Sequence, residues 1–358
     1  MMSDLARIRA VSAPYRTVLI GCGPRGRQHA LGLRANESRF TLTAVCDLDP
    51  RRLASLADEL GTVRRYADAE TMLVSEAPDV LCFATPCAVR LPLVELGVAH
   101  GVRAIALEKP LASSLTEARR IVDVCAGAGV RGVVCHQLRH GAHWQRARAI
   151  IEAGGIGEVR SVHATGRPSM LRVGTHLVDC ALWLTGAERV HWVVGQAAGT
   201  TGYDDDHPGP DHLAGMASLG GEIRAVLEVG TLAPRELDEP GFWGDLGVRV
   251  LGTDGWVRVV LGAGWWASSR KSRGQVECGP ADPSPQEARH LALLADWLDD
   301  AERVHPCELE RSYHGLEVLM GMALSAAEQR RVDLPITPVP AAILERLRAV
   351  LPEGPAAQ

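Results

Sequence analysis

Lys109 stands out because the 38 basic residues of this chain include only one other lysine, Lys271. It directly follows Val102–Glu108, an apolar run that predicts a β-strand, and precedes Pro110. An ammonium group can give up its proton and a guanidinium group effectively cannot, so a lysine kept in an arginine-rich chain points to chemistry. At a strand end, Lys109 could donate a hydrogen bond to a reacting oxygen and stabilise developing alkoxide charge.

His176 and Asp179 form a second pair with acid/base potential, next to the apolar run Cys180–Leu184. On a helix their spacing places both side chains on one face, where the carboxylate could orient the imidazole or join it in contacting a polyol. An imidazole is the usual general base near neutral pH. We therefore expect His176 to exchange a substrate proton; a capped helix start is the alternative interpretation.

A glycine-rich turn, Gly21-Cys-Gly23-Pro-Arg-Gly26, lies between a predicted strand and a predicted helix. Gly21 would make the tight turn, Gly23 would admit a pyrophosphate, and Gly26 would let helix and strand pack closely. Asp47 follows at the end of the next strand, where a carboxylate bonds ribose hydroxyls and repels a 2′-phosphate. The pattern predicts NAD rather than NADP; a glycine turn without a nucleotide is the alternative.

Alternating strands and helices predict the fold of the first part of the chain. The expected strands begin at Thr17, Phe40, Asp79, Val102 and Gly132. Helical stretches separate them, and this order predicts a doubly wound parallel sheet that binds ligands at the carboxyl ends of its strands. We expect residues 1–140 to form an NAD-binding Rossmann domain.

The pattern changes after roughly Arg148, where strand candidates follow one another with few helices between them. These candidates are Val159–Ala164, Val190–Ala197, Leu213–Leu219, Ile223–Gly230, Leu246–Leu251 and Gly255–Val260. They predict an α/β domain with a mostly antiparallel sheet over residues 141–358, closed by two amphipathic helices, Gln286–Asp300 and Tyr313–Arg330.

The composition excludes several classes of protein. With 23% charged residues and a formal net charge of −5, the chain lacks both the charge excess of a disordered protein and the positive charge that binds nucleic acid or anionic membranes. Nine cysteines without a CxxC pair are typical of a reduced protein. No segment predicts a signal peptide or membrane span, so we expect a cytoplasmic protein with a small-molecule substrate. We expect no metal site, because the consecutive residues Asp204–His207 predict a solvated acidic loop.

Taken together, these motifs resemble the Gfo/Idh/MocA oxidoreductases, a family named after glucose-fructose oxidoreductase and inositol dehydrogenase. The resemblance rests on motifs in order along nearly the whole chain: the glycine turn, Asp79–Pro86, Glu108-Lys109-Pro110, Gly154–Val159, Gly174–Asp179, Gly252–Gly255 and Arg331–Pro335. It implies reversible oxidation of a hydroxyl on a sugar, amino sugar or cyclitol. It also implies a homodimer or homotetramer formed through the C-terminal sheet.

The resemblance also implies roles for individual residues. Lys109 and His176, with Asp179, would be catalytic. The cofactor would be bound by Gly21, Gly23, Pro24, Arg25, Gly26, Asp47, Thr85, Pro86, Glu108, Lys109 and His136. The substrate would meet Lys109, Arg139, Arg172, His176 and Asp179.

Two positions depart from the family pattern. Arg172 stands four residues before His176, where many members carry an aspartate, and arginine cannot serve as a base. Either Asp179 takes over the role of the missing aspartate, or the substrate is anionic, or the chemistry differs from alcohol oxidation. Arg90 stands where many members of the family carry a histidine.

Two alternative functions remain open. One is a glycosidase or lyase that uses NAD transiently, and the other is a non-catalytic sugar-sensing regulator.

Overall fold

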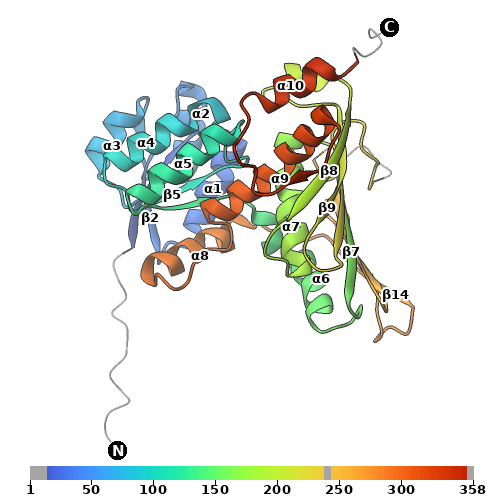
Figure 1. The fold of residues 1–358 in the computed structure, drawn as a ribbon. Coiled ribbons are helices and arrows are strands. Elements are labelled where there is room, and N and C mark those ends of the chain that lie inside the picture. Colours follow the sequence, from blue (N-terminus) through green and yellow to red (C-terminus); the bar gives the residue numbers. More distant parts are fainter. Residues whose placement is uncertain (1–13, 238–242, 353–358) are drawn as a thin grey trace, which may run out of the picture.

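The N-terminal part of the molecule is a parallel sheet with helices on both faces (Figure 1). The computed structural model describes residues 14–237 and 243–352. Its first sheet has the order β3-β2-β1-β4-β5-β6, and every neighbouring pair is parallel. This is the strand order of a dinucleotide-binding sheet, so the predicted Rossmann fold is confirmed.

The strands of this sheet are β1 (Tyr15–Ile20), β2 (Phe40–Cys46), β3 (Arg64–Tyr66), β4 (Val80–Phe83), β5 (Ala104–Leu107) and β6 (Arg131–Val134). The helices around it are α1 (Pro24–Arg34), α2 (Pro50–Leu60), α3 (Ala69–Glu76), α4 (Arg90–Ala99) and α5 (Leu115–Gly127). Every residue of β4 and β5 is buried, because helices cover both faces. Their sequences are therefore the continuous apolar runs from which the strands were predicted.

In the described part of the chain, the second sheet has nine strands in the order β14-β13-β12-β11-β7-β10-β9-β8-β15. Its strands are β7 (Val159–Gly166), β8 (Trp192–Ala198), β9 (His212–Ser218), β10 (Arg224–Val229), β11 (Leu246–Gly252), β12 (Trp256–Val260), β13 (Gly264–Ser268), β14 (Val276–Pro280) and β15 (Val332–Asp333). Among the described strands of this sheet, only the β7–β10 pair is parallel, which confirms the prediction of a mostly antiparallel sheet.

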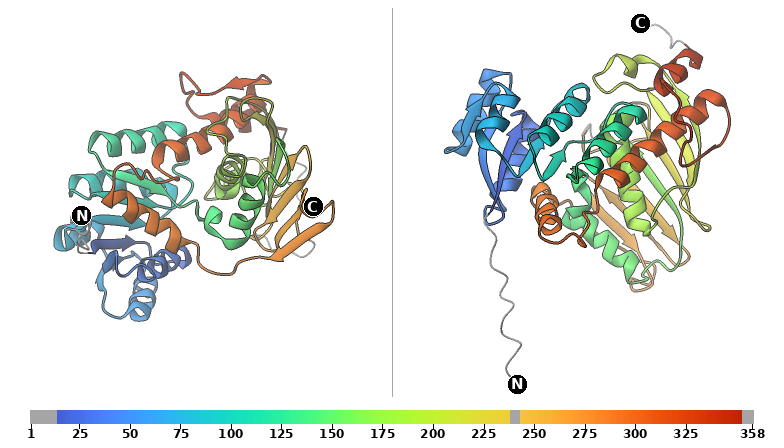
Figure 2. Two further views of the ribbon diagram at one scale, coloured as in Figure 1. Left: turned by 90° about the horizontal axis from the view of Figure 1, so that it is seen from below. Right: turned by 60° about the vertical axis from the view of Figure 1, so that its left-hand side comes forward.

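One face of the second sheet is covered by helices, as the two views of Figure 2 show. The helices of this part are α6 (Ala142–Glu152), α7 (Thr175–Thr185), α8 (Glu287–Asp299), α9 (Leu309–Glu328) and α10 (Ile343–Val350). Among them, α6, α7 and α9 contact the sheet, whereas α8 packs against α1 of the first sheet. The division into residues 1–140 and 141–358 stays a prediction.

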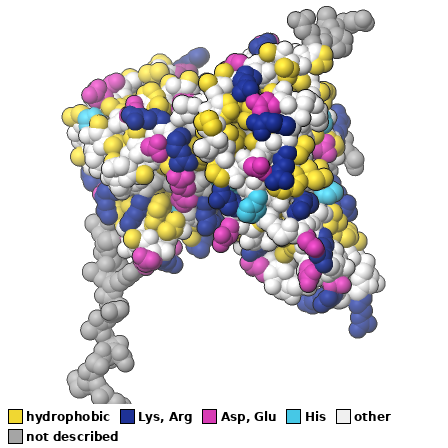
Figure 3. All heavy atoms as spheres, in the orientation of Figure 1, with side chains coloured by type: hydrophobic (Ala, Val, Ile, Leu, Met, Phe, Trp, Pro, Cys, Tyr) yellow, Lys and Arg dark blue, Asp and Glu magenta, His cyan; other side chains and the backbone are white. Residues whose placement is uncertain are grey.

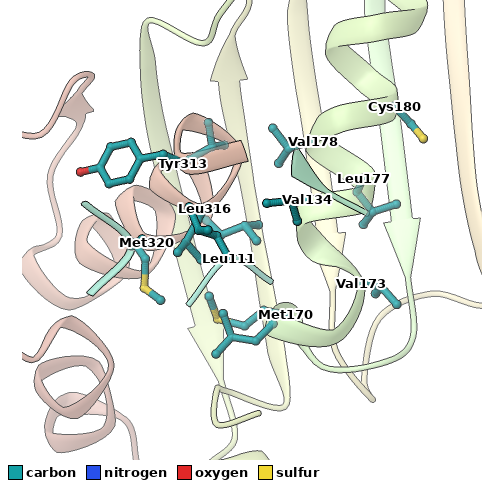
Figure 4. Packing of buried hydrophobic residues seen from close by; sticks show 14 of the residues in the cluster. Leu111, Val134, Met170, Val173, Leu177, Val178, Cys180, Tyr313, Leu316 and Met320 are labelled. Carbon is teal, nitrogen blue, oxygen red and sulfur yellow. The ribbon is translucent and has the colours of Figure 1, made fainter. Parts of the chain in front are cut away.

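A continuous hydrophobic core joins the two sheets and holds the loops on which the candidate site lies. Figure 4 shows Leu111 from the loop after β5, Leu177 from α7 and Leu316 from α9 in this cluster. All three side chains are buried. Leu111 lies two residues after Lys109, and Leu177 follows His176, so the packing fixes both predicted catalytic residues relative to each other.

Within residues 14–237 and 243–352, none of the helices has the length and apolar character needed to cross a membrane.

Candidate active site

The glycine-rich turn between β1 and α1 leaves room beside the amide end of the helix. Gly21 has a φ of +92°, which favours glycine, and a Cβ on Gly26 would overlap the carbonyl oxygen of Gly21. Gly23 caps α1 without a side chain, and a Cβ built on it would meet nothing within 4 Å. The start of α1 can therefore receive an anionic group such as a pyrophosphate, so the residues present fit a dinucleotide.

Asp47 is fixed against this turn by two backbone hydrogen bonds. Its Oδ2 accepts from the Cys22 N–H at 2.6 Å and its Oδ1 from the Asp49 N–H at 2.8 Å. A cleft of about 620 Å³ lies alongside, with Arg27, Arg51 and Arg52 among its lining residues. Asp47 thus lies at the expected place for a ribose-binding carboxylate, but arginine side chains flank the same cleft.

Glu108 and Arg25, both predicted to bind the cofactor, bind each other. Arg25 donates to Glu108 Oε1 from Nε at 2.9 Å and from Nη2 at 2.7 Å, and His29 Nε2 lies 3.0 Å from the same oxygen. Arg25 also pairs with Glu287 of α8 at 2.9 Å. Burial alone would raise the pKa of Glu108, but Arg25 and His29 hold it well below its usual value. Glu108 is therefore a buried anion that ties α1 to the end of β5.

Lys109 is half-buried beside Glu108 and directs its ammonium toward the second part of the chain. Its Nζ donates a 2.9 Å hydrogen bond to the backbone carbonyl oxygen of Arg172. Burial lowers the pKa of the Lys109 ammonium, and the charge of Glu108 opposes that shift. Among the described residues it has no carboxylate within ion-pair distance, so its positive charge remains available to a developing oxyanion.

His176 lies in the first turn of α7, and its side chain is buried. Neither ring nitrogen has a hydrogen-bond partner among the described residues, and Nδ1 is out of reach of solvent. The ring of His136 packs edge-on against it, with the two centroids 5.3 Å apart. Burial, followed by the proximity of His136 and Lys109, lowers the pKa of His176 well below its usual value, so the imidazole is neutral at pH 7 and can accept a proton.

Asp179 shares α7 with His176, but its carboxylate pairs with Arg139 of η2 (Gln137–His140). Arg139 donates from Nε at 3.0 Å and also from Nη2, and both side chains are largely buried. The structure therefore brings Asp179 and Arg139 together and does not place Asp179 in hydrogen-bond contact with His176. This ion pair fixes α7 to the segment that follows β6.

Arg90 holds the ends of two neighbouring strands. Its guanidinium donates to the carbonyl oxygen of Thr85 at 3.0 and 3.2 Å and to that of Lys109 at 3.2 Å. Arg90 is 2% exposed. Thr85 and Pro86, predicted to flank the cofactor, follow β4 at this edge of the sheet. Arg90 thus has a structural role, because it donates hydrogen bonds to backbone carbonyl groups at the ends of β4 and β5.

Arg172 lies in the π-helical turn Met170–Gly174 that precedes α7. Its guanidinium donates to Asp205 Oδ1 from Nη2 at 2.5 Å and from Nε at 3.2 Å. The same oxygen accepts the His207 N–H at 2.8 Å. Burial and then Arg172 and Lys109 lower the pKa of His207 to about 4. The sequence reasoning treated Asp204–His207 as a solvated loop, because no local signal shows that it folds back over Arg172.

A family model described as "Oxidoreductase family, NAD-binding Rossmann fold" matches residues 15–136. This segment, about a third of the chain, is thus similar to the NAD-binding domain of the Gfo/Idh/MocA oxidoreductases. The predicted resemblance is thereby confirmed.

The curated proteins similar to this chain include several named as sugar dehydrogenases. D-apiose dehydrogenase of Rhizobium rhizogenes is 35% identical over 142 residues, covering 39% of this chain and 40% of that protein. D-xylose 1-dehydrogenase [NADP(+)] of Haloarcula marismortui is 26% identical over 275 residues, covering 70% of this chain and 73% of that protein. The chain aligns with 40% and 55% of the length of two D-apiose dehydrogenases.

Solved structures share the whole fold. An oxidoreductase from Agrobacterium radiobacter, in complex with NAD+, L-tartaric acid and magnesium, superposes with a TM-score of 0.75 at 21% identity, over 89% of this chain and 98% of that one. At this identity the likeness establishes the architecture of both sheets and not the substrate.

Proposed function

We propose that this protein is an NAD-dependent dehydrogenase that oxidises a hydroxyl-bearing carbon of a sugar, cyclitol or related polyol. The observation that carries the proposal is the placement of Lys109 and His176. The Lys109 ammonium bonds the carbonyl oxygen of Arg172, four residues before the neutral, buried imidazole of His176. A cation and a proton acceptor thus flank the carboxyl edge of a dinucleotide-binding sheet.

The glycine turn and Asp47 would hold the dinucleotide. The open amide end of α1 at Gly23 suits the pyrophosphate, and the carboxylate of Asp47 suits ribose hydroxyls. When bound, the nicotinamide supplies the hydride acceptor, which no amino-acid side chain can provide. Thr85 and Pro86 would lie beside the nicotinamide at the end of β4, with His136 at the end of β6.

Lys109 and His176 would handle the substrate oxygen and its proton. The half-buried ammonium of Lys109 would donate a hydrogen bond to the hydroxyl oxygen and stabilise the negative charge that develops as the proton leaves. The neutral imidazole of His176 would accept that proton. Arg139 and Asp179 would act as positioning residues, because their ion pair fixes the helix that carries His176.

The open face of the second sheet supports assembly of the chain into a homodimer or homotetramer. Val194 of β8 and Met216 of β9 pair across the strands, and both are unusually exposed for large apolar side chains. A second copy of the chain would cover this face. Light scattering of the purified protein tests the assembly.

The dehydrogenase is tested by incubating purified protein with NAD and a panel of neutral sugars, cyclitols and sugar acids while NADH absorbance is followed. We expect NADH to accumulate with at least one polyol and this signal to disappear in His176→Ala. Product formation without net NADH would instead identify transient use of the cofactor. Binding of NAD and polyol without any turnover would identify a sensor.

A further inference from the structure

The loop after β8 places a second set of polar side chains beside the Lys109–Arg172 contact. Asp205 Oδ1 accepts three hydrogen bonds from other described residues, two from Arg172 and one from the His207 N–H. Within the described residues, Asp205 Oδ2 accepts none and Arg172 Nη1 donates none. The ion pair therefore has one acceptor atom, Asp205 Oδ2, and one donor atom, Arg172 Nη1, that no other described residue uses.

This ion pair is accessible and has an aromatic neighbour. The side chain of Arg172 is 24% exposed and that of Asp205 is 37% exposed. The guanidinium carbon of Arg172 lies 5.8 Å from the centre of the Trp243 ring, and more than half of the Trp243 surface is exposed. An aromatic ring beside a donor and an acceptor can bind a molecule with an apolar C–H face and polar edges.

The charge balance of this pair distinguishes two kinds of ligand. A hydroxyl group both donates and accepts, so two neighbouring hydroxyls can use Arg172 Nη1 and Asp205 Oδ2 together. A carboxylate or phosphate only accepts, so it would pair with Arg172 while facing the unneutralised oxygen of Asp205. Compared with Arg172 alone, the ion pair therefore favours neighbouring hydroxyls over an anion, because the anion would face the negative charge of Asp205.

We propose that Arg172, Asp205 and Trp243 form a subsite for an uncharged, polyhydroxylated ring, with Asp205 as the residue that excludes acidic substrates. This proposal rests on the proposed dehydrogenase function, because it places the ring beside Lys109. The proposal gives a reason for the arginine that stands at position 172 in place of the family aspartate. Arg172 would act together with Asp205 as a neutral pair that selects the substrate.

The test measures binding to protein saturated with NADH, so that no hydride transfer interferes. The probes are two matched pairs, D-glucose with D-glucuronate and D-galactose with D-galacturonate, whose members differ in one carboxylate. Binding is followed by calorimetry in the wild type, in Asp205→Asn and in the control Asp206→Asn. Asp206 lies in the same loop, is exposed and has no side-chain partner among the described residues.

We expect the wild type to bind the neutral member of at least one pair more tightly than the acid. Asp205→Asn keeps the shape and removes the negative charge, so it should shift the ratio of affinities toward the acid by about tenfold or more, whereas Asp206→Asn should leave that ratio within about twofold. Tighter binding of the acids by the wild type, equal ratios in the wild type and Asp205→Asn, or no binding of any of the four sugars would overturn the subsite.

The outcome for the subsite is separate from that for the dehydrogenase. Neutral sugars that bind in an Asp205-dependent way but never reduce NAD would refute the dehydrogenase and support the subsite. NADH formation with a sugar acid as the preferred substrate would support the dehydrogenase and refute the subsite.

Discussion

The ammonium nitrogen of Lys109 lies 2.9 Å from the backbone carbonyl oxygen of Arg172, so the loop after β5 bonds directly to the turn that precedes α7. This contact joins the loop that leaves the first sheet to the segment that precedes His176. Because the acceptor is a neutral carbonyl group, the contact orients the ammonium without neutralising its charge. A substrate oxygen can then take a further hydrogen bond from the same nitrogen.

Lys109→Arg should abolish turnover nearly as completely as Lys109→Ala, although it keeps the positive charge. The planar guanidinium is larger than the ammonium, so it would misplace its donors, and it cannot give up a proton. Loss of one donor to a developing oxyanion costs about 10²- to 10³-fold in kcat. Steady-state kinetics and NAD titration by calorimetry check this, and NAD binding should survive.

Lys271→Arg is the matched control, since Lys271 is the other lysine and is exposed. It should change neither kcat nor NAD affinity. Near-native turnover in Lys109→Arg would exclude Lys109 from oxyanion stabilisation.

Asp179→Asn should destabilise the fold by about 3 kcal/mol or more, because it leaves the buried guanidinium of Arg139 without its counter-ion. Urea denaturation measures the loss. The control Glu152→Gln removes an exposed i,i+4 partner of Arg148 and should cost about 0.5 kcal/mol or less. If the two variants were equally stable, the Arg139–Asp179 pair would not be what fixes α7.

Asp179 also shows where sequence reasoning stops. Its spacing from His176 correctly places both residues on one helix, yet its partner is Arg139, 40 residues earlier in the chain. Helical periodicity predicts which side chains share a face, and it carries no information about what another element presents to that face. The same limit applies to Asp205, whose contact with Arg172 depends on how a polar loop folds back.

The fold was more predictable than the site, for a physical reason. Buried parallel strands such as β4 and β5 must be apolar throughout, so their sequences identify them. The predictions missed β3, which has three residues with two exposed arginines, and the edge strand β14, where exposed and half-buried residues alternate. Hydrogen bonding to a neighbouring strand forms these elements, and it leaves no apolar pattern.

His290→Phe should reduce the sensitivity of the fold to acid. His290 is fully buried, and neither ring nitrogen has a partner in the described structure, so phenylalanine removes no hydrogen bond. Burial, followed by the nearby His305 and His140, lowers the pKa of His290 well below its usual value. The native state then binds fewer protons than the unfolded chain, so stability is fully present above a pH of about 6.5 and is lost as the pH falls toward the folded pKa.

Urea unfolding at pH 7.5 and pH 5 measures this linkage. We expect a smaller drop in the free energy of unfolding between these pH values in His290→Phe than in the wild type. His191→Phe, at an exposed position, should keep the wild-type drop. An unchanged drop in His290→Phe would show that His290 does not contribute to acid sensitivity.

The last prediction concerns the choice between NAD and NADP. We expect tighter binding of NAD by the wild type, because the carboxylate of Asp47 is held by the Cys22 and Asp49 N–H groups at the place where it would repel a 2′-phosphate. Asp47→Asn removes the charge and retains one of the two acceptor oxygens. It should therefore reduce the ratio of NAD affinity to NADP affinity by about tenfold. Arg51 and Arg52 line the neighbouring cleft. Without the negative charge of Asp47, they should attract the 2′-phosphate of NADP. Arg51→Ala should therefore weaken NADP binding in the Asp47→Asn background and leave NAD binding unchanged. Calorimetric titration of both dinucleotides decides the matter: a wild type that binds NADP more tightly would show that these arginines outweigh Asp47.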